Sequence, residues 1–237
     1  DGQGMTRRRA LHRLGLLAGA PAAGLLGAAA EVAGAVSGDD DAGRKVLRLV
    51  FTRAETSFDP ARIVDLYSRN VTAHIFEALY GYDHLARPAR LRPLTAAGMP
   101  EASDDFRVWT VRLQPGIFFA DDPAFGGRRR ELVAADYVYS FKRLADPANK
   151  SPAAGELLDT GFSGLAGLRD EAMRARKPFD YDRPIEGLQA LDRYTLRFVL
   201  DKPRPRLGFF LAASDLLGAV AREVVEHYGE QVDAHPV

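Results

Sequence analysis

The chain has 237 residues, of which 46% are hydrophobic, so it can enclose one large core or two small ones. Lysine plus arginine equals aspartate plus glutamate at 32 each, so no net charge draws the protein to nucleic acid or to an anionic membrane. Cysteine is absent, which excludes disulfides, thiolate catalysis, thiolate zinc sites and a lipid-modified N-terminal cysteine. Partners must therefore be recognised through shape and local chemistry.

The N-terminal segment 1–36 predicts a cleavable export signal. Arg7 and Arg8 lie in a run, Thr6 to Leu11, that resembles the twin-arginine export motif, although Ala10 stands where that motif has a bulky apolar residue. The alternative is a disordered basic tail followed by an alanine-rich helix.

The apolar run from Leu14 to Ala30 is interrupted by glycine and proline, which makes it too short and flexible for a membrane span. It is interpreted as the hydrophobic part of the signal, and residues 37–45, with three consecutive aspartates, as a solvated linker. Because no cysteine is available to carry a lipid, we expect a protein that is exported and not lipid-anchored, and the periplasm of a Gram-negative cell is favoured.

Residues 46–237 alternate strand and helix patterns. Val46 to Thr52 is apolar and rich in β-branched residues, which predicts a buried strand, and Arg53 to Arg62 predicts a loop. A helix is predicted from Asp65, with Gly81 ending it in a left-handed cap. The segment from Arg87 to Pro100 is expected to be irregular. The next pattern is a half-buried strand, whose inward residues are Trp109, Val111 and Leu113.

Gln114-Pro115-Gly116 has proline and glycine where a type II turn needs them, so two strands are predicted to fold back on each other here. After an insert from Ala120 to Arg130, a helix is predicted with Tyr137, Phe141 and Leu144 on one face and with Asp146-Pro147 at its end. The remaining predicted elements are a surface helix around Leu165 to Ala172, a hairpin of Leu188–Leu191 and Thr195–Leu200, a buried helix over Leu207–Ala213, and a helix over Ala221–Tyr228 closed by Gly229.

The order of these segments resembles one family, the peptide- and nickel-type extracellular solute-binding proteins (family 5) of ABC importers. Glu55 to Pro60 is similar to a family segment that ends in Leu-Asp-Pro, and Ile75 to Tyr80 resembles its Tyr-Glu-Gly-Leu helix. Ser103 to Phe119 is similar to its Ser-Asp-Asp, strand, Arg-Pro-Gly, strand sequence, and Ala134 to Leu144 resembles the helix that follows. Leu191 to Phe198 resembles a later hairpin. The resemblance extends from about Leu47 to the last residue.

The resemblance implies an α/β fold, a mixed sheet with flanking helices, that forms the N-terminal lobe of a two-lobed type II periplasmic-binding-protein fold. Family members continue beyond the equivalent of Val237 into Gly-Thr-Gly-Pro and a second lobe, so 46–237 is expected to be a truncated N-terminal part with the C-terminal lobe absent. The insert Ala120 to Arg130 is longer than the Asp-Gly turn of most members. It sets this chain apart from the usual form.

The implied function is capture of a solute, without catalysis. The resemblance implies a periplasmic monomer that binds an oligopeptide, a nickel complex, haem or another small solute and delivers it to a membrane permease and its ATPase. No cofactor, nucleic acid or stable membrane insertion is expected. The candidate cleft-lining residues are Glu55, Thr56, Ser57 and Phe58, because loops that follow the first strand carry ligand contacts. The alternative is a solvated turn in which Ser57 and Asp59 cap local amides.

Two other classes of function stay open: a non-binding truncated fragment or interaction module, and a metal-dependent hydrolase. The sequence contains neither a phosphate-binding Gly-x-x-x-x-Gly-Lys nor a His-Glu-x-x-His motif, and Leu165 stands where a nucleophile elbow after Ser163 requires glycine. The five histidines are scattered, and Asp121-Asp122 and Arg128 to Arg130 are interpreted as solvated loop residues. No catalytic or metal-binding residue is predicted.

Overall fold

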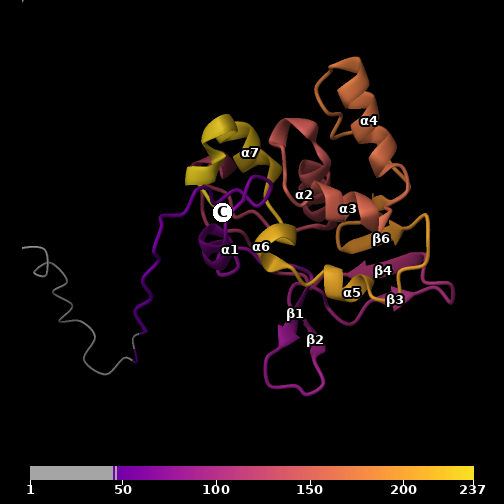
Figure 1. Cartoon of the computed structure of the whole chain (residues 1–237), viewed down its shortest axis with the longest axis horizontal. Helices are drawn as coiled ribbons and strands as arrows, with labels where there is room; N and C mark the ends of the chain where they lie inside the picture. Colours follow the sequence, from indigo (N-terminus) through magenta and orange to yellow (C-terminus); the bar gives the residue numbers. More distant parts are fainter. Residues whose placement is uncertain (1–44, 46) are drawn as a thin grey trace, which may run out of the picture. The chain divides into compact units, whose positions relative to one another are not determined.

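The computed structural model describes residues 45 and 47–237, and the chain divides into two compact units, Asp1–Val50 and Phe51–Val237 (Figure 1). The predicted signal, with Arg7 and Arg8, lies outside the described residues. In the first unit, Lys45 and residues 47–50 form no helix or strand and are exposed.

The predicted buried strand is wrong: residues 47–52 are exposed and do not form a strand. A strand must pair with a neighbour to satisfy its backbone groups, and no strand in the part of the chain that the structure describes pairs with this segment. Phe51 instead contacts the ring of Tyr67, with 5.0 Å between the ring centroids.

The main sheet has four antiparallel strands in the order β3-β4-β6-β5. These strands are β3 (Glu101–Ala102), β4 (Val108–Arg112), β5 (Leu188–Ala190) and β6 (Thr195–Val199). The register sets Trp109 opposite Phe198 and Val111 opposite Leu196, and all four side chains are buried. The predicted alternation of the first strand and the predicted later hairpin are both confirmed.

The helix α2 (Ala134–Ala145) packs against β5 of this sheet, and α3 (Ala154–Thr160) and α4 (Leu165–Ala175) pack against α2. Tyr137, Phe141 and Leu144 are at most 1% exposed, which confirms the predicted helix and its buried face. The Phe141 ring lies 5.9 Å from that of Phe162 and 5.8 Å from that of Phe198, centroid to centroid. Such aromatic contacts add to the stabilisation that burial alone provides.

The helix α1 (Leu66–Thr72) begins where it was predicted, with Asp65 as its N-cap, but ends at Ala73 and not at Gly81. The Thr72 hydroxyl donates to backbone carbonyls of the preceding turn at 3.0 and 3.2 Å. The chain then forms an unpredicted two-stranded hairpin of β1 (Tyr80–Asp83) and β2 (Arg90–Pro93). Tyr80 and Tyr82, near the predicted end of the helix, lie in a strand instead. Tyrosine is common in strands.

The Pro115-Gly116 turn is present, with a φ of 82° at Gly116, but the predicted hairpin across it is wrong. Both edges of β4 are already paired, with β3 and with β6. Residues 117–119 therefore pair with residues 130–132: the Leu132 amide donates to the Ile117 carbonyl at 2.8 Å and the Phe119 amide to the Arg130 carbonyl at 2.9 Å. Within the insert, Pro123–Phe125 forms a short 3-10 helix with Phe125 buried.

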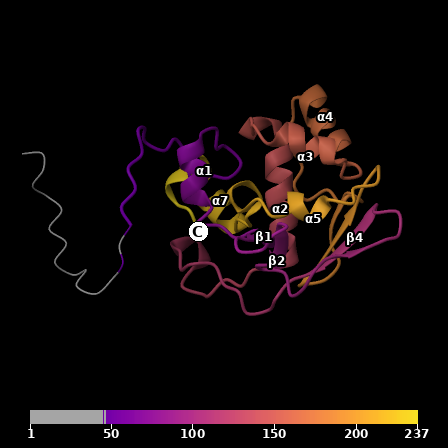
Figure 2. The same cartoon turned by 60° about the horizontal axis from the view of Figure 1, so that its bottom comes forward.

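The C-terminal part contains α5 (Leu207–Phe210), α6 (Ser214–Leu217), α7 (Arg222–Tyr228) and a 3-10 helix over Gly229–Ala234. The helix α7 and its end at Gly229 confirm the prediction, whereas α5 is shorter than predicted. In both views the C-terminus lies beside α1 and α7 (Figures 1 and 2). None of the helices formed by residues 47–237 has the length and apolar character needed to cross a lipid bilayer.

Candidate functional site

The predicted ligand loop, Glu55–Phe58, is held against the start of α1 by hydrogen bonds. The Thr56 amide donates to the Ser68 hydroxyl at 2.9 Å, and the Thr56 hydroxyl donates to the Asp65 carboxylate. Hydrogen bonds from Ser68 and Thr56 hold the pKa of Asp65 well below its usual range. The hydroxyl of Thr56 is therefore engaged in fixing the loop.

Ser57 and Asp59 form the local caps considered above as the alternative. The Ser57 hydroxyl accepts from the Asp59 amide at 3.0 Å, and the Asp59 carboxylate accepts from the Ala61 amide at 3.0 Å. Phe58 is half-buried, whereas Glu55 is exposed and forms no hydrogen bond or ion pair within the described part of the chain. Glu55 is the member of the loop whose polar side chain is available to a ligand.

A buried ion pair fixes the loop to α2. The guanidinium of Arg143 donates to both carboxylate oxygens of Asp59, at 2.7 and 2.8 Å, and the two side chains are 3% and 0% exposed. Burial opposes the charge on Arg143, but the Asp59 carboxylate outweighs it and raises the pKa of Arg143. No local pattern in the sequence predicts that these two residues, 84 positions apart, meet.

A small, largely apolar pocket of about 250 Å³ lies next to this region, between the end of α1, residues 117–120 and the C-terminus. Phe76, Phe118 and Leu132 provide apolar walls, and His74 and Glu77 lie at its edge. Pro236 and Val237 also line it, so it lies where the chain reaches its last residue.

A larger groove of about 930 Å³ lies between α2, α7 and residues 181–191, and we call it the α2–α7 groove. Its lining combines apolar, aromatic and charged side chains: Arg130, Ala135, Asp136, Val138, Tyr139, Lys142, Tyr181, Asp182, Pro184, Ile185, Glu186, Leu188, Gln189, Ala190, Leu191, Arg222, Glu223 and Glu226. A pocket of this size with a few converging polar groups is the usual form of a small-molecule site. The sequence analysis did not predict it.

Aromatic and charged groups build the floor of the α2–α7 groove. The rings of Tyr139 and Tyr181 lie 5.0 Å apart, and the Arg222 guanidinium lies 5.6 Å from the centroid of Tyr139. The Lys142 ammonium donates to the carbonyls of Tyr181 and Arg183, at 2.8 and 2.7 Å, and burial lowers the pKa of Lys142. Burial, assisted by the hydrogen bond to Asp146, raises the pKa of Tyr181.

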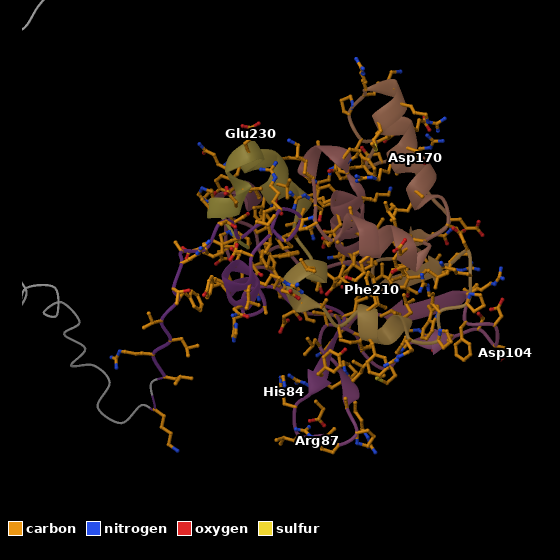
Figure 3. All side chains as sticks on the ribbon, in the orientation of Figure 1. His84, Arg87, Asp104, Asp170, Phe210 and Glu230 are labelled. Atoms are coloured by element: carbon orange, nitrogen blue, oxygen red, sulfur yellow. The ribbon has the colours of Figure 1, made fainter. Side chains whose placement is uncertain are left out.

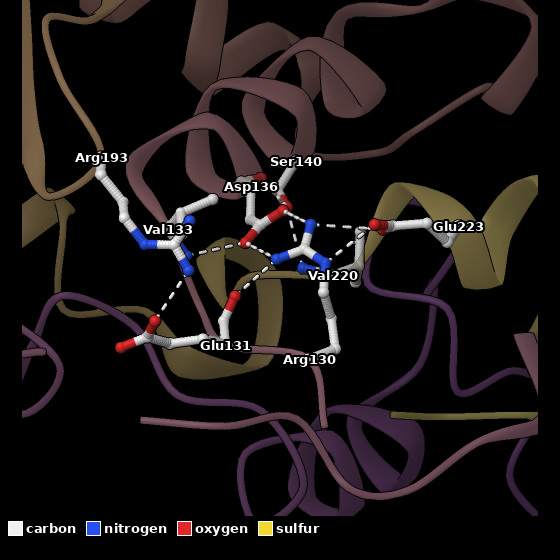
Figure 4. A network of polar contacts seen from close by, with 8 residues as sticks. All are labelled: Arg130, Glu131, Val133, Asp136, Ser140, Arg193, Val220 and Glu223. Atoms are coloured by element: carbon white, nitrogen blue, oxygen red, sulfur yellow. Dashed lines mark hydrogen bonds and ion pairs between the residues drawn. The ribbon is translucent and has the colours of Figure 1, made fainter. Parts of the chain in front are cut away.

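One edge of the groove is held by Arg130, the last residue of the insert (Figure 4). Its guanidinium donates to Asp136 at 2.7 and 3.1 Å and to Glu223 of α7 at 2.8 and 3.3 Å. Burial raises the pKa of Asp136 against the effect of Arg130, whereas Arg130 lowers the pKa of Glu223 against its partial burial. The interpretation as solvated residues is thus wrong for Arg130, while Arg128 and Arg129 are exposed.

The arrangement is suited to binding. Most of its charged groups are paired with one another, and in the part of the chain that the structure describes no three histidine or acidic residues are grouped to hold a metal ion. A signal for the groove was present in the sequence: Ala135, Val138, Tyr139 and Lys142 follow the i, i+3, i+4, i+7 spacing of a second face of α2. This face was not recognised because the buried face accounted for the helix.

The solved structures similar to this chain include peptide-binding proteins. The Haemophilus influenzae OppA in complex with RPPGFSPFR is 26% identical, with a TM-score of 0.61 over 76% of this chain and 31% of that one. The Escherichia coli murein tripeptide-binding protein MppA is 27% identical, with a TM-score of 0.59 over 77% of this chain and 32% of that one. The predicted α/β class is confirmed, and the match covers only part of the neighbours.

Residues 90–237 match the bacterial extracellular solute-binding proteins, family 5 (middle region), and the chain belongs to this family. It is 29% identical to the periplasmic oligopeptide-binding protein OppA of Escherichia coli K12 over 177 residues, which are 74% of this chain and 28% of OppA. It is 32% identical to the periplasmic murein peptide-binding protein MppA of the same strain over 149 residues, 63% of this chain and 24% of MppA. The chain thus spans less than a third of the length of these relatives.

Proposed function

We propose that the protein is the substrate-binding component of an ABC importer, which captures peptides or a similar small solute and delivers them to a membrane permease and its ATPase. Family membership carries this proposal. The names of the relatives support the ligand class, since they include oligopeptide-, murein peptide- and di/tripeptide-binding proteins and a glutathione-binding protein. The family is one of binding proteins, and we propose that this chain has no catalytic activity.

The proposal includes a periplasmic location, because OppA and MppA are named as periplasmic proteins. Export through a signal that contains Arg7 and Arg8, cleaved to leave a monomer without a lipid anchor, is the route we propose. We also propose that Glu55, in the loop Glu55–Phe58, contacts the ligand, because this side chain is exposed and has no partner in the described part of the chain. The α2–α7 groove is the second candidate, favoured by its volume and its converging polar groups.

The ligand class can be tested by native mass spectrometry of the protein purified from its own host without denaturation. We expect peptide-sized adducts that disappear after unfolding and refolding, and that return when a mixture of short peptides is added. A bound metal ion together with hydrolytic turnover would instead favour the hydrolase. A preparation that never binds a peptide would favour the interaction module.

The two candidate surfaces can be separated with charge-reversal variants. Glu55→Arg changes the predicted loop, and Glu186→Arg changes an exposed acid that lines the α2–α7 groove. Glu230→Arg is a matched control, since Glu230 is exposed on the 3-10 helix after α7 (Figure 3) and lines neither the α2–α7 groove nor the apolar pocket. Weaker peptide binding, measured by calorimetry, in only one of the first two variants identifies the ligand surface. Equal binding by all three variants contradicts both assignments.

A further inference from the structure

The β1–β2 hairpin carries a local positive charge in a chain whose total charge is zero. Arg87, Arg90 and Arg92 lie between Tyr80 and Leu94, where the only acidic residue is Asp83. Arg90 and Arg92 are exposed and form no ion pair with any residue that the structure describes. The whole sequence is neutral, but the hairpin therefore has more basic than acidic residues.

The geometry of the hairpin places two of these charges together. Arg90 and Arg92 are two residues apart on β2, so they lie on the same face of the ribbon. Asp83 stands opposite Arg90, but its carboxylate accepts from the Leu85 amide at 3.0 Å. The Arg87 guanidinium donates to the carbonyls of His84 and Ala86, at 3.0 and 2.8 Å, and keeps its charge at the tip.

Apolar side chains accompany the arginines. Leu85, in the turn, is 92% exposed, and Tyr82 is 42% exposed with its ring 6.1 Å from that of Phe209. The Arg206 guanidinium lies 5.4 Å from the centroid of the Phe209 ring and adds a further cation beside the hairpin. In the register of the hairpin Tyr82 stands opposite Leu91, on the other face of the ribbon from Arg90 and Arg92. An exposed aliphatic side chain close in sequence to arginines, as Leu85 is to Arg87 in the turn, is common in segments that bind at a membrane interface.

The hairpin presents this patch away from the neighbouring elements, with His84 and Arg87 at its far end (Figures 1 and 3). Its base is firmly attached, because Tyr80 is buried and the Leu94 and Ala96 amides both donate to the Leu79 carbonyl, at 3.1 and 3.2 Å. The tip is thus an exposed projection on a fixed base.

We propose that the β1–β2 hairpin docks the protein on the surface of an anionic phospholipid bilayer. Arg87, Arg90 and Arg92 would bind lipid phosphates, and Leu85 would enter the boundary between headgroups and acyl chains. A bilayer fits better than an acidic protein because a specific protein interface needs roughly 800 Å² and 20 to 30 residues on each side, which a hairpin tip does not offer. A fluid bilayer requires no matching shape and accepts a single aliphatic side chain.

Such docking would be weak and reversible, and it is independent of the proposed solute-binding function. Each arginine near an anionic surface strengthens binding by about fivefold, so losing two should weaken it by about 25-fold. Salt screens these charges, and binding should fall as the ionic strength rises.

The test is co-sedimentation of the full chain with vesicles of phosphatidylcholine and phosphatidylglycerol, compared with vesicles of phosphatidylcholine alone. The hairpin variant is Arg90→Gln/Arg92→Gln, which breaks no hydrogen bond or ion pair found in the described residues. The control, Arg128→Gln/Arg176→Gln, removes the same charge from exposed positions elsewhere. Leu85→Ser tests the apolar contribution.

We expect binding to the anionic vesicles only, an approximately 25-fold loss in the hairpin variant, a smaller loss for Leu85→Ser, and unchanged binding by the control. Equal losses in the hairpin and control variants would show that bulk charge is responsible and would overturn the proposal. So would the absence of binding to anionic vesicles. Another outcome is that the hairpin variant keeps its binding to vesicles but loses its binding to an acidic protein. That result would assign the patch to the protein and would also overturn the proposal.

Discussion

The ion pair between Asp59 and Arg143 should be among the most sensitive points of the fold. Asp59→Ala removes the acceptor for both guanidinium nitrogens, at 2.7 and 2.8 Å, and for the Ala61 amide, at 3.0 Å. It leaves Arg143, only 3% exposed, without its counter-ion, and the Nε of this residue already has no hydrogen-bond partner. Removing one partner of such a pair costs about 3–5 kcal/mol.

The measurement is urea denaturation followed by circular dichroism. With a loss of about 4 kcal/mol and a slope of about 2 kcal/mol per molar urea, the midpoint of Asp59→Ala should fall by about 2 M. Glu101→Ala is the control, because Glu101 and Arg112 form a surface pair with side chains 62% and 63% exposed. Breaking an exposed pair of this kind costs less than about 1 kcal/mol.

A double-mutant cycle tests the cause. Arg143→Met in the Asp59→Ala background removes the unpaired charge. The double variant should therefore lose about 2 kcal/mol less unfolding free energy than the two single variants lose together. The reasoning is refuted if the two losses simply add, or if Asp59→Ala is no more harmful than Glu101→Ala.

Three further predictions follow from named contacts. Hydrogen bonds from Arg193, the Gly116 amide and Tyr194 lower the pKa of Glu131 from 4.5 to about 2. The ionised Glu131 therefore stabilises the fold above pH 4.5, and this stabilisation is lost as the pH falls toward 2. Between these pH values the stability of Glu131→Gln should fall less than that of the parent protein, and parallel curves of stability against pH would contradict this. Gly187→Ala would place a Cβ within 2.3 Å of the Ser163 amide nitrogen and should destabilise the fold by more than about 2 kcal/mol. Gly167→Ala in α4, where the space is open, should instead stabilise the fold by roughly 0.5–1 kcal/mol. Thermal melts measure both changes, and similar melting temperatures for the two variants would refute the packing argument. Lys142→Met removes the donor to two carbonyls of the groove wall, at 2.8 and 2.7 Å. Amide exchange should become about tenfold faster or more at residues 180–186 and stay unchanged in β4. Equally faster exchange in both segments would show a global loss of stability instead.

Residues with a strong local pattern were predictable from the sequence. The burial of Tyr137, Phe141 and Leu144 follows from their spacing. The end of α7 at Gly229 follows from the conformational freedom of glycine, which has a φ of 56° there. The predictions were wrong where the structure depends on partners that are distant in the chain. Residues 117–119 pair with 130–132 because β6, about 80 residues away, already occupies the edge of β4.

The candidate site was harder to predict for the same reason. Hydroxyl groups at Thr56 and Ser57 are equally suited to a ligand and to a cap, and only the position of Ser68 and Asp65 shows that they hold the loop. The α2–α7 groove brings together α2, residues 181–191 and α7, three segments whose proximity no local pattern encodes. Side-chain type predicts what a residue can bind, and tertiary structure decides which partner it has.

Two arginines connect the beginning and the end of the second unit through α2. Arg143 joins the loop before α1 to α2 through Asp59, and Arg130 joins the start of α2 to α7 through Asp136 and Glu223. Tyr139 lies between these two points on the helix and lines the α2–α7 groove. A shift of α2 would therefore change the loop and the groove together. We therefore expect a ligand bound at either candidate surface to slow amide exchange at the other, and unchanged exchange at the second surface would contradict this coupling.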